Sequence, residues 1–140
     1  MKAFIDTSSL IKLYHKEIDS NKILNTLSNV EDIYLSELTR IEVLSALWKK
    51  VREGSLKEDN AIKVISCFQS DYNKFQWIKL ETQIIETASD LLMKYGNKGL
   101  RTLDSLQFAS ALILKDTSCI FFTSDKLLKT LFIEENLNVI

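Results

Sequence analysis

The sequence predicts an α/β fold: a three-layer α/β/α sandwich around a central, mostly parallel sheet of about five strands. Short apolar runs rich in β-branched and aromatic residues, without polar alternation, are typical of strands buried on both faces of a parallel sheet. Segments of helical periodicity separate these runs, and strands that alternate with helices pair in parallel through right-handed crossovers. The chain has 140 residues, of which 46% are hydrophobic, so we expect a single domain over residues 1–140 with one full core.

Strand and helix candidates alternate along the chain. The strand candidates are residues 2–6, 33–36, 77–80, 119–123 and a weaker run at 138–140. The helical patterns cover residues 8–15, 21–27, 37–52, 57–72, 83–95, 103–114 and 126–132. Gly96 suits the end of the fifth helix. Residues suited to N-capping stand near the helix starts, and the expected caps are Asp19 or Ser20, Ser36, Ser55, Thr82, Thr102 and Ser124.

Composition excludes several classes of protein. The net charge is −1 and the pI is near 5.9, so the broad basic surface of a typical nucleic-acid binder is absent and any such binding must be local. No apolar run approaches the ~20 residues of a membrane span, and Asp6 interrupts the N-terminus too early for a signal peptide. We therefore expect a soluble, cytoplasmic protein with no membrane partner. Cys67 and Cys119 belong to no CxxC pair, so both are interpreted as reduced, structural core residues.

Four acidic residues stand far apart in the chain, and three of them lie where a strand or loop passes into a helix; they are Asp6, Glu42, Asp104 and Asp125. Asp6 and Asp125 follow apolar runs, which places both at the sheet edge where open α/β sheets bind ligands. Each acid also has a simpler explanation. Asp104 and Asp125 could complement helix macrodipoles, and Asp6 could accept backbone hydrogen bonds at a strand-to-helix turn. Periodicity places Glu42 on the surface, away from the apolar stripe of Ile41, Leu44, Leu47, Trp48 and Val51.

In combination the four acids resemble the PIN-domain family, and especially its single-domain toxin ribonucleases of the VapC type, over essentially the whole chain. The matching stretches occur in the family's order and spacing. They are Phe4-Ile5-Asp6-Thr7-Ser8, Leu38-Thr39-Arg40-Ile41-Glu42-Val43, Leu103-Asp104-Ser105-Leu106-Gln107-Phe108-Ala109-Ser110-Ala111 and Phe122-Thr123-Ser124-Asp125-Lys126-Leu127-Leu128. Each stretch is weakly specific alone, and the match rests on all four together.

The resemblance implies a metal-dependent endoribonuclease whose acidic pocket holds Mg²⁺ or Mn²⁺. Asp6 and Asp104 are expected as direct ligands, with Glu42 and Asp125 acting directly or through water, because hard divalent ions prefer carboxylate and water oxygens. Hydroxyl groups at the same edge could orient the acids or bind metal-bound water; they belong to Thr7, Ser8, Thr123 and Ser124. For Ser8 and Ser124 helix N-capping is the preferred explanation.

Two basic residues precede the Asp104 helix. Lys98 and Arg101 could contact substrate phosphates at the acidic pocket, or belong to a solvated loop. His15, the only histidine, lies about two helical turns beyond Asp6, too far to share a metal ion, and is expected at a helix C-terminus.

The functional prediction is a toxin that cleaves an RNA substrate, and the resemblance further implies a cognate antitoxin as partner and a homodimer. Other classes stay open. One is a catalytically silent PIN-fold module that binds RNA or protein, and another is a housekeeping RNA-processing nuclease. A phosphotransferase similar to the haloacid dehalogenases needs a second acid two residues after the first, and Ser8 occupies that position here.

Overall fold

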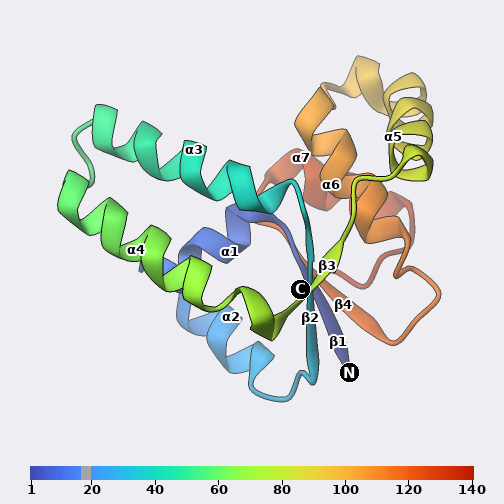
Figure 1. Cartoon of the computed structure of the whole chain (residues 1–140). Coiled ribbons are helices and arrows are strands. Elements are labelled where there is room, and N and C mark those ends of the chain that lie inside the picture. The colour runs from blue at the N-terminus through green and yellow to red at the C-terminus, as the bar shows by residue number, and fades with distance from the viewer. Residues whose placement is uncertain (17–19) are drawn as a thin grey trace.

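The computed structural model describes residues 1–16 and 20–140, built around a parallel sheet with helices on both faces (Figure 1). The four strands are β1 (Lys2–Ile5), β2 (Asp32–Ser36), β3 (Phe75–Ile78) and β4 (Cys119–Phe122), and their order in the sheet is β3-β2-β1-β4. All three strand pairs are parallel, which confirms the predicted α/β class.

Seven α-helices lie within the described residues. They are α1 (Thr7–Tyr14), α2 (Ser20–Leu27), α3 (Thr39–Arg52), α4 (Glu58–Ser70), α5 (Thr82–Tyr95), α6 (Thr102–Leu112) and α7 (Lys126–Glu134), with short 3-10 helices at η1 (Tyr72–Lys74) and η2 (Gly96–Lys98). Each of these α-helices is too short or too polar to cross a membrane.

Two details of the predicted sheet are wrong. The weak fifth strand at 138–140 is only a single parallel bridge, in which the N–H of Phe121 donates to the carbonyl of Asn138 at 2.9 Å. Three residues are too few to build a ladder. The third strand lies two residues earlier than predicted, because β3 is an edge strand and its half-exposed residues do not form a continuous apolar run.

Most of the predicted helix caps are also wrong, since the helices begin after other residues. Two aspartates supply the side-chain caps: Asp6 accepts from the N–H of Ser9 at 3.0 Å and Asp125 from the N–H of Leu128 at 2.7 Å. The residues proposed as caps, Ser36, Ser55, Thr82, Thr102 and Ser124, do not hold those positions. Gly96 does cap the C-terminus of α5, Ser20 is the first residue of α2, and Asp19 lies outside the described residues.

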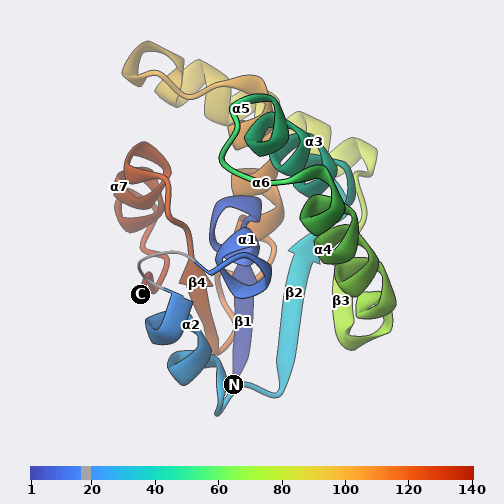
Figure 2. The ribbon, with the colours of Figure 1, turned by 90° about the vertical axis from the view of Figure 1, so that its left-hand side faces the viewer.

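The strands divide the apolar side chains between the two faces of the sheet. In β1, Ala3 and Ile5 pack with α1 to α4, while Phe4 packs on the opposite face with α5 to α7. Figure 1 shows these helix layers to the left and right of the sheet, and Figure 2, seen from the first layer, shows α1 in front of β1. Cys119 is buried and free as predicted, whereas Cys67 is exposed on α4, so only Cys119 is a core residue.

The strand order reverses beside β1, which positions the site. The chain moves from β1 to β2 and β3 in one direction and then returns to place β4 on the other side of β1. The carboxyl ends of β1 and β4 are therefore neighbours, and the N–H of Asp6 donates to the carbonyl of Phe122 at 3.1 Å. Ligands of open α/β sheets bind at such a reversal.

An aromatic cluster fixes the start of α3 against the edge strand. The guanidinium of Arg40 lies 4.7 Å from the ring centre of Tyr72 and 4.3 Å from that of Trp77. The indole N–H of Trp77 donates to the carbonyl of Tyr72 at 3.0 Å, so both rings are held in place. Stacking of a guanidinium on two aromatic faces is favourable, and it holds the helix turn that carries Glu42.

Candidate functional site

A groove of about 660 Å³ opens at the carboxyl edge of the sheet, and all four predicted acids line it. Asp6 and Asp125 follow the ends of the neighbouring strands β1 and β4, Glu42 lies in the first turn of α3 and Asp104 in the first turn of α6. Residues separated by more than a hundred positions in the chain thus face one space. Apolar side chains also line the groove. Among them, Ile41 is 63% exposed and Leu103 is 50% exposed.

Asp6 is the most deeply placed of the acids, with 3% of its surface exposed. One carboxylate oxygen, Oδ1, accepts from the Oγ of Ser8 at 2.7 Å and from the N–H of Ser9 at 3.0 Å, and the other accepts from the hydroxyl of Thr123. Burial raises the pKa of Asp6 to about 6, the hydrogen bonds oppose that rise, and the nearby Asp125 adds to it. A cation in the groove would favour the ionised form of this carboxylate.

Glu42 lies in the groove although periodicity predicted a surface residue. Its Oε1 accepts from the hydroxyl of Thr7 at 2.9 Å and from the side-chain amide of Gln107 at 2.7 Å. Burial raises the pKa of Glu42, both hydrogen bonds lower it, and the charge of Asp104 raises it further. The core side of α3 is formed by Val43 and Leu47. The predicted stripe was wrong in part, since Ile41 and Trp48 are exposed.

Gln107 is a site residue that the sequence reasoning missed. It is 4% exposed, and its Nε2 lies 2.7 Å from Glu42 Oε1, 3.0 Å from Thr39 Oγ1 and 3.1 Å from Thr7 Oγ1. Its Oε1 is buried with no hydrogen-bond partner among the described residues. The signal was present in the sequence, because Gln107 is a polar residue among the buried apolar positions of α6. A buried amide needs a partner, and Glu42 is that partner.

Asp104 has a side chain that is 28% exposed and lies 3.8 Å from the Nε of Arg101. Burial and the charge of Asp125 raise the pKa of Asp104, while Arg101 opposes the rise. Arg101 lines the groove. Lys98 instead donates to Oε1 and Oε2 of Glu134 at 3.1 and 3.3 Å and is not among the groove-lining residues.

The predicted hydroxyl residues make different contacts from one another. Thr123 links two acids, because its Oγ1 donates to Asp6 and accepts from the N–H of Asp125 at 3.2 Å. Ser8 donates to Asp6 and accepts from the N–H of Ser124 at 3.0 Å, so it is not the helix cap that was preferred for it. The Oγ of Ser124 lies 3.0 Å from that of Ser9, and its described hydrogen bonds reach no acid.

His15 lies at the C-terminal end of α1, as predicted, where its N–H donates to the carbonyl of Ile11 at 2.7 Å. His15 is not among the residues that line the groove. The described residues therefore offer no histidine to the acids.

The donor set suits a hard divalent cation. Within residues 1–16 and 20–140, no three carboxylate, histidine or cysteine side chains stand close enough to enclose an ion by themselves. Mg²⁺ is usually bound by one or two carboxylates with water and substrate phosphate completing the shell. Burial is the main cause that raises the pKa of Asp6, Glu42 and Asp104, and the charge of a neighbouring acid adds to it. A cation among these acids would offset both effects, because it favours the ionised carboxylates.

Comparison with known proteins agrees with this geometry. The family model described as PIN domain matches residues 3–131. Ribonuclease VapC3 of Pyrobaculum aerophilum is 28% identical over 98 residues, which make up 69% of this chain and 72% of that protein.

Solved structures show the same fold at lower identity. The structure of VapBC2 from Rickettsia felis bound to a DNA fragment from their promoter matches with a TM-score of 0.67 at 18% identity, over 100% of this chain and 98% of the other. VapC20 of Mycobacterium tuberculosis, described as a Sarcin-Ricin loop cleaving toxin, matches with a TM-score of 0.66 at 14% identity, over 92% and 94%. Because the family model spans nearly the whole chain, the protein belongs to the PIN domain family.

Proposed function

We propose that this protein is a metal-dependent endoribonuclease and the toxin of a toxin–antitoxin pair. The observation that supports the proposal most strongly is that four carboxylates line one groove at the strand-order reversal. Membership of the PIN domain family and the similarity to a curated ribonuclease point to the same chemistry.

Asp6 and Asp104 would hold Mg²⁺ or Mn²⁺ directly, with Glu42 and Asp125 acting directly or through water. Such an ion, when bound, activates water and offsets charge on the scissile phosphate. The hydroxyls of Ser8 and Thr123 hold the Asp6 carboxylate in one orientation, so its position does not depend on the ion. Without a cation, the pKa of about 6 means that Asp6 is ionised above that pH, and a bound cation would extend the ionised range to lower pH.

Glu42 is oriented through one of its oxygens. The hydrogen bonds described for Glu42 all reach Oε1, from Thr7 and Gln107, which leaves Oε2 to accept from a ligand or from water. Arg101 lines the same groove and carries the positive charge suited to a phosphate oxygen. The groove therefore offers oriented carboxylates and cationic side chains to the reacting phosphodiester, since Lys49 and Arg52 line it together with Arg101.

The test is cleavage of RNA with and without metal. EDTA should stop cleavage, and Mg²⁺ or Mn²⁺ should restore it. Asp104→Asn should nearly abolish turnover, whereas Asp90→Asn on the exposed face of α5 removes the same charge and should not. Cleavage that survives chelation would refute the mechanism.

A second test identifies the nucleophile. If water attacks the phosphorus, a substrate with a 2′-deoxy sugar at the cleavage position should still be cut, because the neighbouring hydroxyl is not needed. Loss of cleavage in that substrate, with formation of a cyclic phosphate in ordinary RNA, would assign the attack to the 2′-hydroxyl and refute the water mechanism.

An antitoxin is the partner that we propose, because the similar structures include VapBC complexes. Expression of the chain in a bacterial host should arrest growth, the Asp104→Asn variant should not, and the cognate antitoxin should restore growth. Growth unaffected by an active enzyme would favour a housekeeping nuclease. A homodimer is proposed on the same resemblance, and light scattering would test it.

A further inference from the structure

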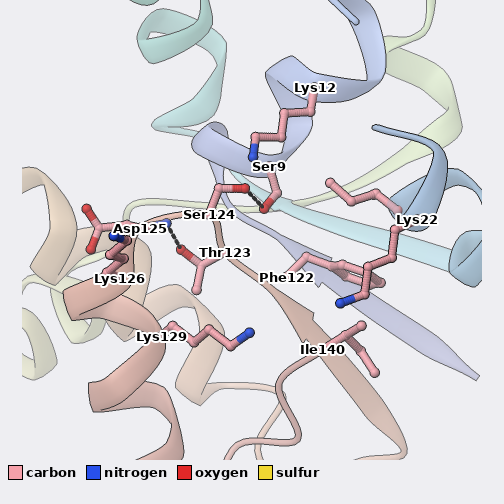
Figure 3. Close-up of a pocket in the computed structure, with 11 residues that line it drawn as sticks. Ser9, Lys12, Lys22, Phe122, Thr123, Ser124, Asp125, Lys126, Lys129 and Ile140 are labelled. Carbon is pink, nitrogen blue, oxygen red and sulfur yellow. Dashed lines mark hydrogen bonds between the residues drawn. The ribbon is translucent and has the colours of Figure 1, made fainter. Parts of the chain in front are cut away.

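A second cavity, of about 180 Å³, adjoins the acidic groove and is rich in lysine. It lies between α1, the start of α2, the end of β4 and α7 (Figure 3). Four lysines line it, which are Lys12, Lys22, Lys126 and Lys129. One acidic side chain, that of Asp125, is also in the lining, so the lysine side chains give the cavity an excess of positive charge.

The four lysines come from three helices and line one cavity, although Lys126 lies beside Asp125, apart from Lys22 and Lys129. Figure 3 shows Lys22 and Lys129 extending toward one another from opposite sides, with Lys12 above them. No carboxylate of the described residues forms an ion pair with Lys22, Lys126 or Lys129, whereas Lys12 has a contact of its own within the chain. Lys22 and Lys129 are exposed and able to bind a ligand.

The position of two of these lysines is unfavourable for the helix that carries them. Lys126 and Lys129 lie in the first turn of α7, where the macrodipole favours negative charge. An anion bound there would be stabilised by the helix N-terminus and by the ammonium groups together. The hydroxyls of Ser9 and Ser124, 3.0 Å apart, add polar groups to the same wall. This set of donors matches a phosphate group.

The cavity and the acidic groove share Asp125, so they are neighbours. An RNA strand with one phosphodiester among the acids must bring further phosphates close by, and the acids themselves repel the strand. The chain has a net charge of −1 and 18 lysines and arginines, four of which line this cavity. Local positive charge beside the groove would offset that repulsion.

We propose that this lysine pocket binds a backbone phosphate of the RNA substrate next to the cleaved bond. The proposal rests on the nuclease function proposed above. Lys22 and Lys129 supply the phosphate contacts, and Asp125 lies at the boundary between the binding pocket and the acidic groove. The predicted contacts from Lys98 and Arg101 lie elsewhere, since neither residue lines this pocket.

The experiment measures binding of a labelled single-stranded RNA oligonucleotide by the Asp104→Asn protein at several salt concentrations. In this non-cleaving background, K22Q/K129Q should weaken binding about tenfold or more at 0.1 M salt. The slope of log K against log salt should fall by ~1.4, at ~0.7 for each lost phosphate contact. The matched control is K57Q/K63Q, because both lysines are exposed on or beside α4, away from either cavity, and carry the same total charge. Its slope should be unchanged.

Equal affinity and equal salt slope for the two double variants would overturn the proposal. It would also be overturned if K22Q/K129Q weakened the binding of an acidic peptide but left the binding of RNA unchanged. Melting curves of both variants check that each is folded. Cleavage by the protein with Asp104 intact is measured separately, so a chain that binds RNA through the pocket but never cleaves would refute the nuclease function alone.

Discussion

Replacing Asp6 by Asn should change the pH dependence of stability in a direction that a simple helix cap does not predict. In the folded protein the pKa of Asp6 is about 6, against 3.8 for the ordinary carboxyl, chiefly because the group is buried. The folded state therefore holds this proton more tightly than the unfolded state. Protonation of Asp6 therefore adds to the free energy of unfolding. This contribution is complete below pH 3.8 and is lost as the pH rises through about 6.

The size of the effect follows from the shift. A change of about 2 pKa units corresponds to ~3 kcal/mol at 1.36 kcal/mol per unit. For a chain of 140 residues, with an unfolding entropy of ~2.1 cal/mol/K per residue, this is a melting-temperature change of roughly 10 °C. Asn keeps the cap, since its carbonyl oxygen can accept from the N–H of Ser9, and it carries no charge to bury.

Thermal unfolding of wild type and Asp6→Asn in EDTA, between pH 4 and pH 7.5, measures the difference. The two proteins should melt at similar temperatures at pH 4, and the variant should be more stable at pH 7.5 by up to ~3 kcal/mol. Glu42 and Asp104 titrate in both proteins, so their contributions largely cancel in the comparison. Asp90→Asn, which changes an exposed acid, is the matched control and should follow wild type.

Metal should remove most of this difference in stability. At ~100 times its dissociation constant, Mg²⁺ or Mn²⁺ should stabilise wild type by ~2.7 kcal/mol, and Asp6→Asn should gain much less. A variant that is less stable than wild type by the same amount at pH 4 and pH 7.5, with no metal effect on either protein, would refute the reasoning. Asp6 would then be a helix cap only.

Three further predictions concern the rest of the groove. Gln107→Leu removes the amide donor that lowers the pKa of Glu42, so the acid limb of the activity profile should move to higher pH; an unmoved limb would exclude this role. Asp104→Asn should raise the melting temperature in EDTA by relieving repulsion, whereas a loss of ~0.3–1 kcal/mol would show a helix-dipole acid instead. Arg101→Ala should lower the salt slope of RNA binding by ~0.7 to 0.9. Lys98→Ala should leave the slope unchanged, because Lys98 is paired with Glu134. Equal slopes for the two variants would exclude Arg101 from the substrate site.

The sequence predicted the fold class because strands that are buried on both faces are continuous apolar runs, as β4 illustrates with four buried residues. It misplaced β3 because part of that strand is exposed, so its residues do not form such a run. The helix caps were predicted from residue preference alone. In the folded chain the capping positions depend on where each strand ends, and there Asp6 and Asp125 had the right geometry.

The candidate site was only partly visible in the sequence. Asp6 could be placed at the sheet edge from its position after a buried strand. Glu42 could not be placed by periodicity, because the groove exposes apolar Ile41 beside it and so disguises which side of α3 faces the core. The pocket that Lys22 and Lys129 line brings together residues more than a hundred positions apart in the chain, and a local sequence pattern does not predict such proximity.

The placement of β4 beside β1 has a consequence for how the protein is made. Asp6 is synthesised well before the residues that position it, because the carbonyl of Phe122 and the hydroxyl of Thr123 lie at the end of β4 and directly after it. A nascent chain that has not yet extended to residue 125 lacks both the neighbouring strand and one of the four acids. Such a chain cannot assemble the groove, so the proposed nuclease is inert toward its own messenger until the ribosome has translated residue 125.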